Sequence, residues 1–145
     1  MSHYLDIKTQ ITDLECLVEA LCRIETRTGQ WNKNKIEVHE TPQNLYGYQG
    51  DVRSQKANVI IRKLHVGGAS NDIGFLKSPD GTYTSIISEF DRRFYNLLWS
   101  EKLSTYYGVE KAKKEFKVKG IKYTETVDEK GRIQLRAKIQ EKGMY

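Results

Sequence analysis

Hydrophobic and polar positions follow their clearest pattern over Ser70–Asp91, which predicts a β-hairpin. The Ser78–Gly81 segment is typical of a turn, because its proline presets φ at the second position and its glycine accepts a positive φ at the last. Strands are predicted on both sides, over Asp72–Leu76 and Thr82–Ile87. Gly74 interrupts the first strand, which indicates either a bulge or a close approach by a ligand or partner backbone.

A long helix is predicted directly after this hairpin. Ser88 and Asp91 have the spacing of a capping box, and apolar residues follow at helical spacing. The apolar residues that we expect to face the core are Phe90, Phe94, Leu97 and Leu98. The helix is predicted to run to about Tyr107 and stop at Gly108, and a second helical segment should end at Gly120.

The N-terminal third shows a strand that passes directly into a helix. Alternation over residues 3–11 predicts a half-buried strand whose inward residues are His3, Leu5, Ile7, Thr9 and Ile11. Thr12 and Glu15 then form a capping-box pattern, and the helix is predicted to end near Thr28. The polar segment Gln30–Lys35 predicts a loop that carries Trp31.

The residue pattern predicts further strands in the middle and at the end of the chain. Short strands are predicted over Lys35–Glu40 and Ala57–Lys63, with a turn at the proline of Thr41–Leu45 and a glycine loop at Gly47–Gly50. A closing hairpin pairs inward residues Ile121, Tyr123, Glu125 and Val127 with Ile133, Leu135, Ala137 and Ile139. The predicted fold is α+β, a mostly antiparallel sheet with helices packed on one face, in the order β-α-β-β-β-β-α-α-β-β.

Length and composition indicate one globular domain over residues 1–145. Charged residues make up 30% of the chain, and no apolar run is long enough to span a membrane. The N-terminal segment lacks the apolar stretch of a secretory signal peptide. Cys16 and Cys22 lie on different faces of one predicted helix, so we expect reduced thiols and a cytoplasmic protein.

The positive charge is concentrated in the C-terminal part. Residues 1–100 contain 12 Lys+Arg and 12 Asp+Glu, whereas residues 101–145 contain 12 and 7, so the last third carries the whole net charge of +5. This asymmetry indicates an anionic partner, or a solvated basic face that keeps the protein soluble.

No catalytic or metal-binding signature is complete. His3, His39 and His65 are far apart, the cysteines lack metal-ligand spacing, and no nucleotide-binding or hydrolase motif is present. The sequence therefore supports neither an enzyme nor a cofactor, although distant residues could still converge into a site.

The first functional hypothesis is a non-enzymatic module that binds an anionic small ligand or a protein partner. The candidate residues, near the glycine loop, the central hairpin and the following helix, are Tyr48, Arg53, Lys56, Asp72 and Arg93. Arg53 and Lys56 follow the loop closely enough to reach an anion held by its N–H groups, or they are ordinary surface charges.

The alternative hypothesis is a nucleic-acid-binding protein. The densest basic cluster consists of Lys111, Lys113, Lys114 and Lys117. Lysines neutralise phosphates and aromatic side chains stack on bases, and tyrosines are interleaved with this cluster. An RNA-recognition signature strand is absent.

Several segments together resemble the hypothetical-chloroplast-reading-frame-thirty-five family of cyanobacteria and algal plastids, also known as domain of unknown function 1257. The segments that carry the resemblance are the opening Met1–Tyr4 with Ile7–Ile11, Leu14–Leu17 with Ala20–Leu21, the loop Gly47–Gly50 and the strand Asp72–Phe75. The resemblance implies a compact α+β domain without a known activity or substrate. Similar proteins occur in bacteriophage genomes, which makes a role in phage–host interplay a hypothesis compatible with the resemblance.

This chain departs from the family pattern at three places. The segments 29–40 and 64–69 are longer than is usual, and the basic cluster at 111–119 is unusual. These departures leave the C-terminal basic region without a role carried over from the family.

Overall fold

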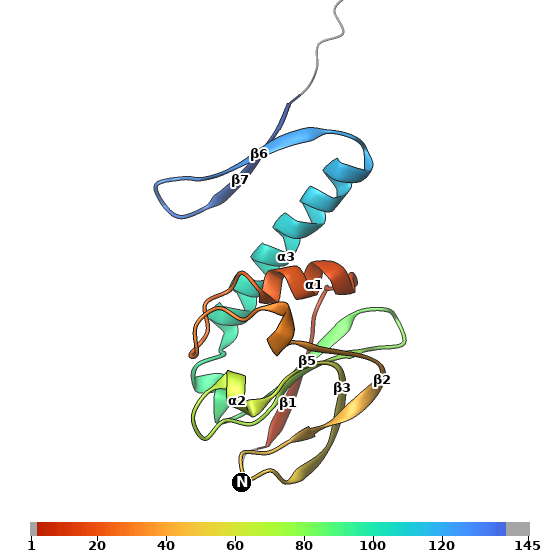
Figure 1. Ribbon diagram of the computed structural model, residues 1–145, viewed down its shortest axis with the longest axis vertical. Coiled ribbons are helices and arrows are strands. Elements are labelled where there is room, and N and C mark those ends of the chain that lie inside the picture. Colours follow the sequence, from red (N-terminus) through yellow and green to blue (C-terminus); the bar gives the residue numbers. More distant parts are fainter. Residues whose placement is uncertain (1–2, 139–145) are drawn as a thin grey trace, which may run out of the picture.

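The fold is α+β, as predicted, and the computed structural model describes residues 3–138. Its elements are β1 (Tyr4–Lys8), α1 (Leu14–Leu21), β2 (Glu37–Tyr46), β3 (Val52–Ile61), α2 (Lys63–Val66), β4 (Ile73–Lys77), β5 (Tyr83–Ser88), α3 (Leu97–Val118), β6 (Lys122–Val127) and β7 (Ile133–Lys138). Five antiparallel strands form one sheet in the order β1-β5-β4-β3-β2, and β6 and β7 form a separate sheet (Figure 1). Ile139, predicted in the last strand, lies outside the described residues.

The predicted central hairpin is confirmed, and its first strand, β4, is the middle strand of the five-stranded sheet. The turn closes through a hydrogen bond from the Ser78 N–H to the Thr82 carbonyl at 2.8 Å, and Gly81 adopts a φ of +90°. This φ is the left-handed conformation that glycine accepts without steric cost.

Gly74 forms no bulge, so that interpretation was wrong. It pairs in register with Ile60 on one side and Ile86 on the other. A Cβ at position 74 would lie 2.6 Å from the Cβ of Ala57 and 3.1 Å from a methyl of Leu45. The close approach is therefore made by the chain's own β2 and β3 rather than by a ligand.

Hydrophobic residues are buried on both faces of the five-stranded sheet. Ile61 and Ile87 belong to the larger cluster, which includes α1, Trp31 and the start of α3. Their neighbours Ile60 and Ile86 belong to a smaller cluster. Because adjacent strand residues point to opposite faces, the two clusters lie on opposite sides of the sheet.

The first helix is shorter than predicted. Its N-cap is Asp13 rather than Thr12, since the Asp13 carboxylate accepts a hydrogen bond from the Cys16 N–H at 3.0 Å. The helix ends at Leu21 instead of near Thr28. Beyond it, the Thr26 hydroxyl bonds to backbone groups of the following residues, which competes with helical hydrogen bonding.

The second strand is longer than predicted and passes through Pro42 without a turn. It is an edge strand, and its register with β3 shifts between Val38 and Gln43. Proline is tolerated at such an edge because its missing N–H removes no essential ladder bond.

Along β1 and the residues just after it, the predicted alternation holds at Ile7, Thr9 and Ile11, which are partly or fully buried. It fails at Tyr4, which is buried, and at Leu5, which is 39% exposed.

The last helix starts later than predicted and continues through Gly108. Ser88 and Asp91 do bond to each other, but they precede a short 3-10 turn, and α3 begins only after the N-cap Asn96. This delay changes which side of the helix faces the core. The expected core residues Phe94, Leu97 and Leu98 are therefore exposed, and the core positions are taken by Tyr95, Trp99 and Leu103.

Candidate nucleic-acid interface

The C-terminal half of α3 and the β6–β7 hairpin stand apart from the five-stranded sheet (Figure 1). We call this unit, residues 109–138, the arm. A two-stranded sheet is only marginally stable by itself in water. The hairpin packs on α3 through Phe116 and Tyr123, whose ring centroids lie 5.6 Å apart.

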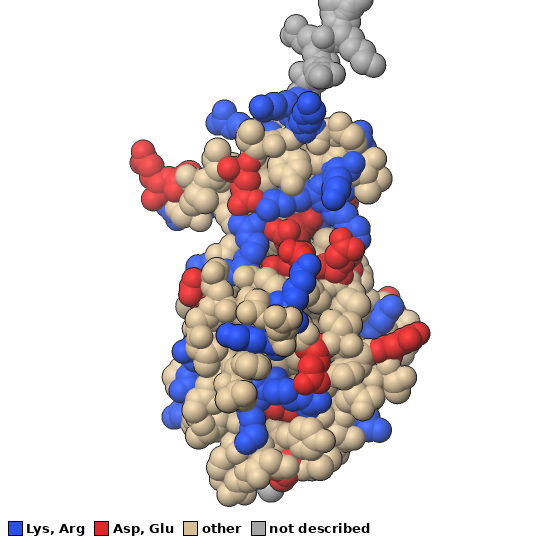
Figure 2. Space-filling view, in the orientation of Figure 1, with Lys and Arg blue, Asp and Glu red and all other residues tan. Residues whose placement is uncertain are grey.

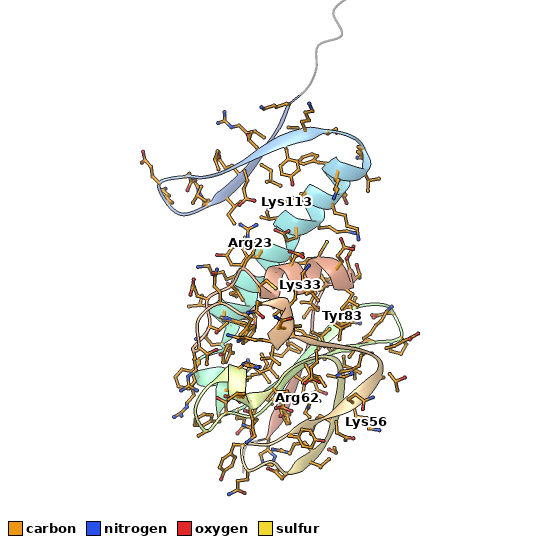
Figure 3. The ribbon with its side chains drawn as sticks, in the orientation of Figure 1. Arg23, Lys33, Lys56, Arg62, Tyr83 and Lys113 are labelled. Carbon is orange, nitrogen blue, oxygen red and sulfur yellow. The ribbon has the colours of Figure 1, made fainter. Side chains whose placement is uncertain are left out.

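Four charged side chains connect the arm to the body. Arg23, at the end of α1, bonds to Glu110 of α3 and to Glu125 of β6, both at 2.8 Å. Lys113 contacts the same two carboxylates, at 3.2 Å and 2.5 Å. Figure 3 shows Lys113 on α3 and Arg23 beside α3, both below the hairpin. This network fixes the hairpin relative to α1, although the two segments are far apart in sequence.

A second set of ion pairs lies at the start of α1. The Asp13 carboxylate accepts hydrogen bonds from Lys114 at 2.7 Å and from Lys111 at 3.4 Å. Burial opposes ionisation of this carboxyl, but the bonds from Lys114 and the Cys16 N–H outweigh it and hold the pKa of Asp13 well below its ordinary value. Three of the four lysines predicted to bind nucleic acid, Lys111, Lys113 and Lys114, thus lie in internal ion pairs.

We predict that Glu125→Gln loosens the hairpin at neutral pH and has a smaller effect in acid. Lys113 and Arg23 lower the pKa of the Glu125 carboxyl. A lowered pKa means that its ion pairs stabilise the folded state above about pH 4 and are lost as the pH falls. Amide hydrogen exchange in β6 and β7, compared between variant and wild type at one pH, should differ more at about pH 7 than at about pH 2.5.

The amides of β4 serve as the internal control for this experiment, because β4 lies in the five-stranded sheet, away from Glu125. Their exchange should not respond to the substitution at either pH. An equal loss of protection in the hairpin at both pH values would show that the charge of Glu125 does not stabilise the hairpin.

The hairpin has one face turned away from α3, which we call the outer face. Its residues, all exposed, are Lys122, Thr124, Thr126, Gln134, Arg136 and Lys138. None of its three cations forms an ion pair within residues 3–138. In Figure 2, Lys and Arg lie over the hairpin, and Asp and Glu lie at its turn end and, mixed with Lys and Arg, at the junction with the body.

Lys117 and Lys119 lie at the end of α3, away from the outer face. Lys117 lines a hollow with Glu15, Glu19 and Tyr123, and Lys119 lines another with Glu115. Both are exposed, and neither has a carboxylate partner in the described part of the chain. Of the predicted basic cluster, Lys117 is therefore the member that remains available to an outside anion.

Asp72, predicted to hold a ligand, is 1% exposed and is occupied by internal bonds. One of its carboxylate oxygens accepts from Arg62 at 2.8 Å and from the Tyr46 N–H at 2.7 Å. The other accepts from the Lys63 N–H at 2.7 Å. Arg62 also donates two bonds to Glu37, at 2.8 and 2.9 Å. This carboxylate organises the junction of β2, β3 and α2.

The other residues of the predicted ligand site are only partly brought together. The Tyr48 N–H donates to Asn71, next to Asp72, and the Arg53 guanidinium lies 4.9 Å from the ring centre of Tyr4. Arg93 lies over Phe90 at 4.4 Å. Lys56 is exposed on β3, at the side of the molecule (Figure 3).

Two further searches bear on other classes of function. Within residues 3–138, no group of three or more His, Cys, Asp or Glu side chains is arranged to hold a metal ion. No helix among these residues is long and apolar enough to cross a membrane.

The sequence prediction missed most of the outer face. It correctly placed Tyr123 and Glu125 on the inner side of the closing hairpin. The same alternation assigns Lys122, Arg136 and Lys138 to the opposite side, so the signal was present in the period-two pattern. The ion pairs of Lys111, Lys113 and Lys114 had no comparable signal.

Comparison with known families gives a match over most of the chain. A family model described as "Protein of unknown function (DUF1257)" matches residues 32–136, which extend from before β2 into β7. No curated protein and no solved structure matches the chain.

Proposed function

The chain belongs to the DUF1257 family of proteins of unknown function, and from its own geometry we propose that it binds nucleic acid through the arm. This membership confirms the resemblance drawn from the sequence. A role in phage–host interplay stays a prediction.

The observation that carries the proposal is the distribution of paired and unpaired cations on the arm. Lys111, Lys113 and Lys114 face carboxylates on the side that contacts the body. On the outer face, Lys122, Arg136 and Lys138 share the surface with threonine and glutamine and with no carboxylate. Cations without internal partners are available to neutralise phosphates, with release of condensed counterions.

The predicted ligand site near Tyr48 has less support. Its carboxylate, Asp72, is buried and bonded internally, and Lys56 lies apart from the others. A small anion or a protein partner at this place remains a hypothesis without a specific contact to carry it.

The proposal predicts that neutralising the outer face weakens nucleic-acid binding. The variant Lys122→Gln/Arg136→Gln/Lys138→Gln should bind a fluorescent oligonucleotide of about 20 nucleotides at least about tenfold more weakly at low salt. Its plot of log affinity against log salt should be shallower by about 0.7–0.9 for each phosphate that the variant no longer neutralises. Fluorescence anisotropy over a salt series measures both quantities.

A matched control separates the position of the charges from the net charge. The variant Lys56→Gln/Lys77→Gln/Arg92→Gln removes two lysines from exposed positions and one arginine from a partly exposed position on the body. Its affinity and salt slope should stay close to those of the wild type. Equal losses in both variants, or binding by the wild type that does not vary with salt, would contradict the proposal.

A further inference from the structure

The shape of the outer face is that of a narrow, two-stranded antiparallel ribbon. Its side chains form three cross-strand pairs, Lys122 with Lys138, Thr124 with Arg136 and Thr126 with Gln134. Six residues in each strand give a length of about 20 Å. Because no other described strand pairs with β6 or β7, the ribbon is narrow enough to enter a groove.

The charges of this face create an unfavourable contact that an anion would relieve. Lys122 and Lys138 lie directly opposite each other in the pairing register. Like charges in cross-strand positions destabilise a hairpin, and none of the described carboxylates forms an ion pair with either lysine. Lys117 and Lys119 lie just before this end of the ribbon. Phosphates on both sides of the ribbon would compensate the repulsion.

The outer face has no aromatic side chain on which an unpaired base could stack. The aromatic residue of β6, Tyr123, is on the inner face and packs on Phe116 at 5.6 Å between ring centroids. Single-stranded nucleic acids are typically bound by a basic groove combined with exposed aromatic rings. The outer face supplies the charges without the rings, which argues against single strands as the preferred ligand.

Duplex DNA fits both the dimensions and the chemistry. The major groove of B-form DNA is about 12 Å wide and admits a two-stranded ribbon. In duplex RNA the major groove is too deep and narrow for side chains to reach. Thr124, Thr126 and Gln134 carry the neutral donors and acceptors that can meet base edges, and the cations flank them.

Resting on the proposed nucleic-acid function, we infer that the ligand is double-stranded DNA and that the outer face enters its major groove. Lys122 and Lys138 contact phosphates at one end of the ribbon. Thr126 and Gln134 lie near the turn and face the floor of the groove.

The experiment compares the affinities of the full-length protein for four nucleic acids of one base sequence, each about 20 nucleotides long, at the same salt concentration. These forms are duplex DNA, duplex RNA and the two single DNA strands. Duplex DNA should bind at least about tenfold more tightly than each of the others. A methyl-green competitor, which occupies the major groove, should displace the protein, and a minor-groove competitor of the netropsin type should not.

The outcomes separate the inference from the function on which it rests. Tighter binding of single strands, or equal binding of duplex RNA and duplex DNA, would overturn the duplex-DNA inference and leave nucleic-acid binding intact. Displacement by the minor-groove competitor alone would overturn the groove assignment. Absence of binding to all four forms would overturn both the inference and the proposed function.

A double variant tests the floor of the groove without changing the charge. Thr126→Ala/Gln134→Ala should retain the wild-type salt slope, because it removes no cation. Its affinity for duplex DNA should fall about fivefold or more, and its affinity for single strands should not change. Equal losses for duplex and single-stranded DNA would contradict a role of these side chains in binding the groove.

Discussion

Replacing Asp72 with alanine is expected to lower the free energy of unfolding by about 3–5 kcal/mol. The carboxylate is 1% exposed, and it accepts bonds from Arg62 and from the N–H groups of Tyr46 and Lys63. Alanine would leave two backbone donors without an acceptor and would deprive the partly buried Arg62 of one of its two carboxylates. A buried polar group that loses its partner costs its full desolvation free energy.

Urea unfolding followed by circular dichroism measures the change, with the slope m as the check on the unfolded state. Asp72→Asn keeps one acceptor oxygen and should cost less, about 1–3 kcal/mol, so it remains measurable if the alanine variant does not fold. The matched control is Asp6→Ala, an exposed carboxylate on β1, expected within about 0.5 kcal/mol of wild type. A loss below about 1 kcal/mol for Asp72→Ala at unchanged m would contradict this account.

Replacing Trp31 with alanine should have a cost of similar size, about 3–5 kcal/mol. Trp31 is 2% exposed, although it lies in a polar segment between α1 and β2. Its ring stacks on Tyr95 at 5.9 Å and meets Trp99 edge-on at 6.0 Å between centroids. Its indole N–H donates to the His65 carbonyl at 2.8 Å. Alanine would open a cavity and leave that carbonyl without this donor.

Trp31→Phe separates packing from hydrogen bonding, because phenylalanine keeps an aromatic ring and loses the indole donor. We expect this variant to lose less stability than Trp31→Ala. The matched control is Tyr48→Ala, since Tyr48 is an aromatic residue in a loop but is 43% exposed. If Trp31→Ala cost no more than Tyr48→Ala in denaturant unfolding, the segment around Trp31 would not belong to the core.

The exposed apolar residues near the start of α3 show what helical spacing predicts correctly and what it does not. Phe90, Phe94, Leu97 and Leu98 have helical spacing and correctly indicate a helix, but it begins at Leu97 instead of Phe90. The spacing does not set the point at which the chain turns toward the sheet. Tyr95 reaches the core from the segment between the 3-10 turn at Asp91–Arg93 and the cap Asn96. The helix begins only after Asn96, and Trp99 in its first turn packs against the core.

By itself, the sequence determined the features that depend on neighbours within a few residues. The central turn, the glycine at Gly81, the closing hairpin and the concentration of positive charge after residue 100 were all predicted correctly. Their physical causes are backbone sterics and the alternation of strand side chains, and both act locally. The inner and outer sides of the closing hairpin follow from the same alternation.

Only the tertiary structure decided which cations remain available to a ligand. Lys114 is paired with Asp13, which lies 101 positions away in the sequence, and Arg23 reaches Glu125 across 102 positions. No local pattern specifies such pairs, because they form only when α1 packs against α3. Burial of Asp72 and Trp31 depends in the same way on segments that are distant in sequence, and so on the packing of the whole sheet.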